Sequence, residues 1–377
     1  MISVLVVDDS VVVRRLIQDA LSGEPDITVV GTASNGRLAV GRVEQLKPDV
    51  VTMDIEMPEM NGIEAVRELR KRQHRVPVIM FSTLSSSGAS ATLDALAAGA
   101  TDYVTKPANT GSVQASIEAV RTQLVPKILG LGGKGRRTAA PVAAPSTPVR
   151  TRPQVDPRPT STAFKTTALV APNPNAKIDV IAVGCSTGGP DALATVLGSI
   201  PASLPVPIVV VQHMPPLFTK MFAERLDRTQ AVTVHEATDG VKLLPGNVYI
   251  APGDKHMMVV RQGVDVLTKL TDEPPENSCR PAVDVLFRSV AKTYGASTLA
   301  TILTGMGHDG RAGAAVLRGL GAELIAQDEA TSVVWGMPGA VVEAGLATSV
   351  LPLSRIGAQL ATRANVGRTQ PKLAVSR

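Results

Sequence analysis

The sequence VIAVGCSTGGPDAL, residues 180–193, decides the architecture of the second half of the chain. Its first four residues are apolar and mostly β-branched or small, which predicts a buried strand. The glycines that follow predict a tight turn, and Pro190 suits the first turn of a helix. A buried strand that leads through a glycine-rich turn into a helix is typical of a parallel sheet covered by helices. The free N–H groups at the start of such a helix attract an anion.

The same alternation of apolar runs and helical patterns continues along the rest of the chain. It predicts a doubly wound, mostly parallel α/β domain over residues 177–363, with one hairpin that turns at Gly263. The expected strands lie at 180–183, 208–211, 248–250, 299–303 and 324–326, and the expected helices at 191–198, 282–294 and 311–319.

Residues 1–124 show the pattern a second time and predict a separate domain. Short β-branched runs alternate with helical patterns such as 11–21 and 62–72, which favours a small, flavodoxin-like, doubly wound α/β domain. The expected strands contain residues 4–7, 29–30, 50–53, 78–81 and 103–104.

Between the two domains, residues 125–176 are rich in Pro, Ala, Thr and Arg. Such a segment buries little apolar surface, and its prolines disfavour regular elements, so we expect a flexible linker. Residues 364–377 are polar and basic, and we expect a disordered tail.

Composition excludes several classes of function. The net charge of +5 arises mainly from the linker, and aromatic residues make up only 2% of the chain, so we expect no nucleic-acid partner. The N-terminus lacks a basic region, and no apolar run is long enough to span a bilayer. We therefore expect a cytoplasmic protein without membrane insertion.

Ser186 lies in the glycine-rich turn and is the candidate nucleophile of the second domain. A serine needs a base, and two histidines follow predicted strands. His213 is favoured because its strand should end at the same sheet edge as Ser186, and Asp309 could orient its Nδ1 atom. His308 is the rival base, although it directly precedes Asp309. Cys185 is interpreted as packing.

In the first domain, polar residues follow four predicted strands, where functional groups of parallel sheets gather. Asp8 and Asp9 follow the first strand, Asp54 the third, Ser82 the fourth and Lys106 the fifth. Three clustered carboxylates repel one another and suit Mg²⁺, and an Asp on such a metal can accept a phosphoryl group.

Four motifs make residues 1–124 resemble the receiver domain of bacterial response regulators: LVVDDS (5–10), DVVTMDIEMPEMNG (49–62), VIMFS (78–82) and DYVTKP (102–107). The resemblance implies Asp54 as the phosphorylated residue. It implies a Mg²⁺ site formed by Asp8, Asp9, Asp54 and the Glu56 carbonyl. The remaining pocket residues would be Ser82, the aromatic Tyr103 and Lys106.

Residues 178 to about 355 resemble the catalytic domain of the chemotaxis protein-glutamate methylesterases, through VGCSTGGPDAL (183–193), VVQHMPPLFTKMFAERLD (210–227), VYIAPGDKHM (248–257), CRPAVDVLFRSVA (279–291) and LTGMGHDGRAG (303–313). The resemblance implies Ser186 as nucleophile, His213 as base and Asp309 as the orienting acid, with backbone oxyanion donors at Thr187 and Met306. No cofactor is expected in this domain.

The two resemblances together imply a phosphorylation-activated serine hydrolase. It would remove methyl groups from glutamate methyl esters of chemoreceptors, with release of methanol, and deamidate receptor glutamines. A histidine kinase would supply the phosphoryl group. A docking module that binds an anion without catalysis is the alternative, but such a module needs no base. A DNA-binding output ranks last, because no helix-turn-helix signal is present.

Overall fold

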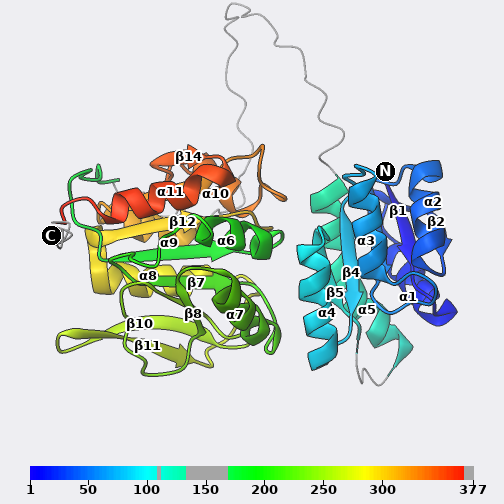
Figure 1. Cartoon of the computed structure of the whole chain (residues 1–377), viewed down its shortest axis with the longest axis horizontal. Coiled ribbons are helices and arrows are strands. Elements are labelled where there is room, and N and C mark those ends of the chain that lie inside the picture. Colours follow the sequence, from blue (N-terminus) through cyan, green and yellow to red (C-terminus); the bar gives the residue numbers. More distant parts are fainter. Residues whose placement is uncertain (108–111, 133–168, 369–377) are drawn as a thin grey trace, which may run out of the picture.

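The computed structural model describes residues 1–107, 112–132 and 169–368, which form two α/β domains (Figure 1). The predicted linker between residues 133 and 168 and the tail after residue 368 lie outside the described residues.

The N-terminal domain has a five-stranded parallel sheet in the order β2-β1-β3-β4-β5, as expected for a flavodoxin-like fold. Helices α1 and α5 cover one face, and α2, α3 and α4 cover the other. The elements are β1 (Ile2–Val7), α1 (Val11–Leu21), β2 (Ile27–Ala33), α2 (Gly36–Leu46), β3 (Val50–Asp54), α3 (Gly62–Lys71), β4 (Val78–Ser82), α4 (Ser86–Ala97), β5 (Asp102–Thr105) and α5 (Val113–Gly132).

The sequence of the loop between β3 and α3 fixes the backbone just after Asp54, the last residue of β3. Asn61 caps α3 and forms a capping box with Glu64, which ends the β3–α3 loop at a defined residue. Gly62 is required there, since a Cβ would lie 2.0 Å from the Asp54 carbonyl oxygen.

Helix α5 is longer than predicted. It continues to Gly132, so residues 125–132 extend a helix where the sequence predicts a linker. Their apolar residues, such as Ile128 and Leu131, are buried and hold them in place.

The C-terminal domain has a seven-stranded sheet in the order β14-β13-β12-β6-β7-β9-β8, and every pair in it is parallel. The elements are β6 (Val180–Cys185), α6 (Gly189–Leu197), β7 (Ile208–Gln212), α7 (Phe218–Thr229), β8 (Thr233–Glu236), β9 (Asn247–Ile250), β10 (His256–Gln262), β11 (Asp265–Thr271), α8 (Val283–Tyr294), β12 (Thr298–Ile302), α9 (Arg311–Gly319), β13 (Glu323–Gln327), α10 (Met337–Glu343), β14 (Ser349–Leu351) and α11 (Leu353–Ala364).

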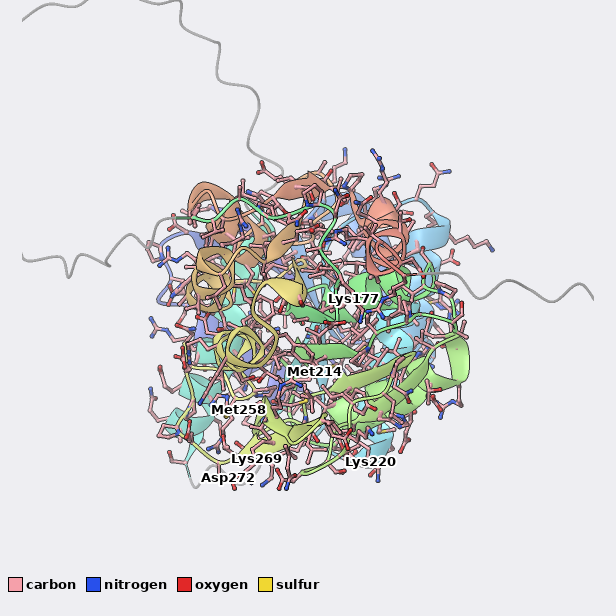
Figure 2. The ribbon with its side chains drawn as sticks, turned by 90° about the vertical axis from the view of Figure 1, so that its left-hand side faces the viewer. Lys177, Met214, Lys220, Met258, Lys269 and Asp272 are labelled. Carbon is pink, nitrogen blue, oxygen red and sulfur yellow. The ribbon has the colours of Figure 1, made fainter. Side chains whose placement is uncertain are left out.

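Strand β6 lies at the centre of this sheet, between β12 and β7, so its residues are buried on both faces. Helices α6, α7 and α11 cover one face, and α8, α9 and α10 cover the other. The predicted hairpin is present as β10 and β11, with Gly263 at a positive φ of 60° in the turn. Figure 2 views the molecule from the side of this domain, with Met258 and Lys269 of the hairpin near the lower edge.

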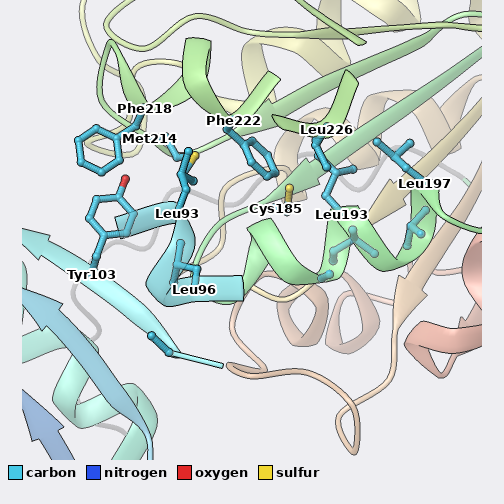
Figure 3. Close-up of a cluster of buried hydrophobic side chains, with 14 of the residues drawn as sticks. Leu93, Leu96, Tyr103, Cys185, Leu193, Leu197, Met214, Phe218, Phe222 and Leu226 are labelled. Carbon is cyan, nitrogen blue, oxygen red and sulfur yellow. The ribbon is translucent and has the colours of Figure 1, made fainter. Parts of the chain in front are cut away.

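The two domains are in contact through the α4–β5–α5 side of the N-terminal domain. Helix α4 packs against α6 and α7, and the Tyr103 ring stacks on the Phe218 ring with centroids 4.8 Å apart. Arg225 of α7 forms a 2.6 Å ion pair with Asp94 of α4. Apolar side chains from both domains merge into one buried cluster (Figure 3), which includes Leu93, Leu96, Leu193, Phe222 and Leu226.

Replacement of Phe287 by alanine should destabilise the C-terminal domain strongly. Phe287 of α8 is fully buried against the central sheet, and removal of a buried phenyl ring costs about 3–5 kcal/mol. Trp335 is the only tryptophan, so its fluorescence during urea unfolding reports on this domain alone. Val264→Ala is the matched control, because Val264 is 94% exposed and its loss should change the free energy of unfolding by less than about 0.5 kcal/mol. Equal stability of the two variants would contradict this account of the core.

Candidate functional site

Ser186 lies directly after the central strand β6, in a turn held by backbone contacts. Its N–H donates to the Thr304 carbonyl over 3.0 Å, and its carbonyl accepts the Gly189 N–H over 2.7 Å. Gly188 adopts a φ of 72°, which favours glycine, and ends the turn at the start of α6. Gln212 of β7 donates its side-chain amide to the Ser186 carbonyl, which ties this turn to the neighbouring strand.

Asp309 lies at the third strand end and is 3% exposed. Both of its oxygens point at the N-terminus of α8, where they accept the N–H groups of Val283 over 2.6 Å and Asp284 over 3.1 Å. Asn277 and the Gly310 N–H each donate to Oδ1 over 2.9 Å. Burial alone would raise the pKa of Asp309, but the bond to His213 and these N–H donors hold it below its ordinary value.

His213 follows β7 and faces Asp309, as the strand-end argument predicts, but through the other nitrogen. Its Nε2 atom lies 2.9 Å from Asp309 Oδ2, so the prediction that Asp309 binds Nδ1 is wrong. Because Asp309 also accepts from a helix terminus, its position is set by α8 and the ring turns Nε2 toward it. A proton on Nε2 leaves the lone pair on Nδ1, and Nδ1 becomes the atom that can accept a proton.

The hydrogen bonds of His213 outweigh its burial. Burial lowers the pKa of the imidazole, but the bonds to Asp309 and to the Cys279 thiol more than offset this effect and raise the pKa to about 9.

Ser186 and His213 line one cavity of about 150 Å³, together with Asp102, Tyr103 and Lys127 of the N-terminal domain. Within the described residues, no hydrogen bond joins the Ser186 hydroxyl to His213. The cavity lies between the domains, so the N-terminal domain covers the edge of the sheet where Ser186 and His213 meet.

The rival residues lie elsewhere. The His308 side chain is exposed and takes no part in the cluster, which removes the rival base. Cys185 is fully buried, and desolvation raises the pKa of its thiol, which agrees with a packing role. His256 starts β10 and is fully buried, with hydrogen bonds to Pro274 and Ala282.

The proposed oxyanion donors are placed favourably. The N–H groups of Thr187 and Met306 donate to no acceptor in the described part of the chain, while their neighbours Ser186 and Gly305 do. Thr187 precedes α6, and Met306 belongs to the loop after β12 beside Ser186. The two groups are thus available to an oxygen that approaches Ser186.

Two residues of this site were not predicted. Asn277 links Asp309 to the buried carboxyl of Asp284 through one amide nitrogen. The Cys279 sulfur lies 3.6 Å from His213 Nδ1. Both belong to a loop without strand or helix periodicity, and only the motif that begins at Cys279 marked its position in the sequence.

In the N-terminal domain the acidic pocket is assembled as predicted. Asp8, Asp9 and Asp54 each place a carboxylate oxygen within 4.8 Å of the others. Lys106 lies 2.8 Å from Asp54 and 3.3 Å from Asp8. Burial is the main cause that raises the pKa of Asp8 to about 6 and that of Asp54 above its ordinary value; their mutual repulsion adds to the shift of Asp8.

This donor set fits Mg²⁺. Asp8 Oδ2 is buried and accepts no hydrogen bond, although Lys106 is nearby, and such an orphaned oxygen is a natural cation ligand. Glu56 lines the same pocket. A divalent ion would neutralise the repulsion from Asp54 that adds to the raised pKa of Asp8.

Ser82 and Tyr103 differ in their placement. Ser82 lines the acidic pocket and contacts Thr92 and the Gly88 carbonyl of α4. Tyr103 was expected among the pocket residues, but it does not line the acidic pocket, and its ring stacks on Phe218 across the domain interface (Figure 3). Tyr103 lies within β5 and faces the domain interface, whereas Lys106 follows the end of that strand.

A phosphorylation-type pocket on one domain and a covered Ser–His–Asp set on the other are the features of a hydrolase controlled by a receiver domain. The CheB methylesterase family model matches residues 181–360, and the response regulator receiver domain model matches residues 4–118. The chain belongs to the CheB methylesterase family, with an N-terminal receiver domain.

Relatives along the full length agree with this assignment. A protein-glutamate methylesterase/protein-glutamine glutaminase of Nocardioides sp. is 52% identical over 99% of this chain and 97% of its own length. One from Trichodesmium erythraeum is 47% identical over 96% of this chain and 98% of its own. The solved catalytic domain of Thermotoga maritima CheB methylesterase is 45% identical and covers 50% of this chain and 99% of that chain, with a TM-score of 0.49.

These comparisons confirm both resemblances, the fold class of each domain and the class of enzyme expected from the sequence. No helix in the described residues is long and apolar enough to cross a membrane.

Replacement of Asp309 by asparagine should lower the pKa of the His213 ring by about one unit or more, because burial then acts without an opposing carboxylate. The measurement is a pH titration of the histidine ring resonances by NMR, with the five histidines labelled. The unchanged protein should titrate near pH 9 at this ring, and His308→Ala should leave that value in place. If the His213 ring of the unchanged protein titrated at the ordinary histidine pKa of 6.5, the proposed ion pair with Asp309 would be refuted.

Proposed function

We propose that this protein is a phosphorylation-activated serine hydrolase that removes methyl groups from glutamate methyl esters of chemoreceptors. The observation that carries the proposal is the 2.9 Å contact between His213 Nε2 and Asp309, at the sheet edge where Ser186 lies in a turn with free N–H groups. The chain belongs to a family whose members bear the name of this activity.

In the proposed reaction, Ser186 attacks the ester carbonyl and His213 Nδ1 accepts the hydroxyl proton. Asp309 keeps the other ring proton on Nε2 and stabilises the imidazolium that forms. The N–H groups of Thr187 and Met306 stabilise the oxyanion. The C–O bond to the methoxy group breaks, and His213 returns the proton so that methanol leaves. Water then attacks the acyl-enzyme with His213 as base, which releases glutamate and restores Ser186.

The same chemistry extends to glutamine side chains. A primary amide presents the same carbonyl to Ser186, and protonation by His213 lets ammonia leave in place of methanol. The relatives named above carry the glutaminase activity in their names. We include deamidation of receptor glutamines in the proposed function.

We infer that the described arrangement is the inactive one. The receiver domain covers the edge of the cavity, so an ester-bearing side chain of a receptor cannot reach Ser186. Steric cover by the receiver domain then suppresses basal turnover.

Asp54 is the proposed site of phosphorylation. A carboxylate oxygen of Asp54 would attack the phosphorus of a phosphohistidine in a cytoplasmic histidine kinase, and the P–N bond would break. Mg²⁺ held by Asp8, Asp9, Asp54 and the Glu56 carbonyl would supply charge neutralisation on the phosphoryl oxygens, and Lys106 and Ser82 would bind the product. Lys106 now binds Asp54 and Asp8, so a phosphoryl group on Asp54 changes its partners.

Replacement of Ser186 by alanine should reduce methanol release from methylated receptor to background, since it removes the hydroxyl group of the proposed nucleophile in the turn after β6. Phosphorylation of Asp54 by a small phosphodonor, followed by mass spectrometry, should proceed as before. His308→Ala is the matched control and should retain full methanol release. Retained activity in Ser186→Ala would remove Ser186 from its role.

Replacement of Leu93 by glutamate should raise basal methanol release without any phosphodonor. Burial of a carboxylate against α7 is unfavourable, so the substitution should weaken the contact between the domains. Leu84→Glu is the control, since Leu84 is 51% exposed on the same domain. A Leu93→Glu protein that circular dichroism shows to be folded, but that keeps the basal rate of the unchanged chain, would count against inhibition by the receiver.

Replacement of Asp54 by alanine should keep the basal rate of methanol release and abolish its stimulation by a phosphodonor.

A further inference from the structure

A cysteine and a histidine approach each other on the side of the His213 ring that faces away from Asp309. Cys279 Sγ lies 3.6 Å from His213 Nδ1, while Asp309 Oδ2 lies 2.9 Å from Nε2. The donor atoms of these three residues all lie within 4.8 Å of one another. Cys279 is partly exposed.

The loop that carries Cys279 is held in place by its own contacts. The backbones of Glu276 and Cys279 exchange two hydrogen bonds of 2.9 and 3.1 Å. Glu276 is paired with Arg288 of α8, and Asn277 donates to Asp309. The sulfur is thus positioned by α8, which also positions Asp309.

The distance between sulfur and nitrogen matches a tetrahedral metal ion. Zinc lies about 2.3 Å from a thiolate sulfur and about 2.0–2.1 Å from an imidazole nitrogen, which at a tetrahedral angle separates the two donors by about 3.6 Å. A histidine that binds zinc through one nitrogen usually donates its other N–H to a carboxylate. Asp309 already occupies that position.

We propose that Cys279 Sγ and His213 Nδ1 form a binding site for a soft divalent cation of the zinc type, with Asp309 as the partner of the ligating imidazole. On binding, the thiol and the protonated ring each release one proton to solvent, and the metal–sulfur and metal–nitrogen bonds form. Water completes the coordination on the side of the cavity. With two protein ligands, binding is reversible and selects soft cations over Mg²⁺.

The consequence for activity rests on the proposed function. The Nδ1 lone pair that would accept the Ser186 proton is bound to the metal, so the site is inhibitory. Removal of the cation restores the base.

The test uses the full reduced chain in excess Mg²⁺, which keeps the receiver carboxylates occupied, and Co²⁺ as a spectroscopic substitute for Zn²⁺. We expect a thiolate-to-cobalt charge-transfer absorption band that saturates at one Co²⁺ per chain and disappears on addition of Zn²⁺. Cys279→Ala should lack the band even though Cys185 remains. His308→Ala, which removes an exposed histidine nearby, should keep it. A band that persists in Cys279→Ala, or no band in the unchanged chain, overturns the site.

Inhibition is measured separately, as methanol release against Zn²⁺ concentration, with each protein normalised to its own metal-free rate. The concentration of Zn²⁺ for half inhibition should rise by about tenfold or more in Cys279→Ala. A cobalt band without Zn²⁺ inhibition would support the metal site and contradict the role of His213 as base. Equal inhibition of both proteins would overturn the inhibitory role of Cys279.

Discussion

The hydrogen bonds between Asp309 and the N-terminus of α8 are the constraint on which the catalytic site depends. Burial alone would raise the pKa of this carboxylate, and the bond to His213 together with the N–H groups of Val283 and Asp284 holds the pKa below its ordinary value. The negative Asp309 then selects which nitrogen of His213 carries the proton. The orientation of His213, which follows β7, therefore depends on helix α8 through Asp309.

Parallel topology brings the remaining parts together and also makes them easy to cover. The loops after β6, β7 and β12 meet at one edge of the sheet, since adjacent parallel strands end on the same side. A site at a sheet edge is open in one direction only. The α4–β5–α5 surface of the receiver domain lies in that direction, so steric control needs no change within the catalytic domain.

The sequence predicts both folds and most of the site because each depends on local patterns. Ser186, His213 and Asp309 stand after apolar runs, and the position of such residues in a parallel sheet follows from topology alone. The nitrogen of His213 that faces Asp309 could not be predicted, because it depends on where α8 begins. Cys279 and Asn277 lie in an irregular loop without periodicity. Tyr103 faces the other domain, and no pattern within 1–124 describes an interface with a distant segment. The length of α5 was missed because Pro126 suggested a break, whereas buried apolar residues keep the helix intact.

The apolar contact between α4 and α7 has an evolutionary consequence. Its free energy sets the ratio of covered to uncovered molecules before any signal arrives, and a ratio of about 99:1 corresponds to only about 2.7 kcal/mol. Few side chains, such as Leu93, Leu96 and Phe222, supply that amount, and none of them takes part in chemistry. Substitutions there adjust how much phosphorylation is needed for a given response, so the sensitivity of adaptation is heritable separately from the catalytic rate.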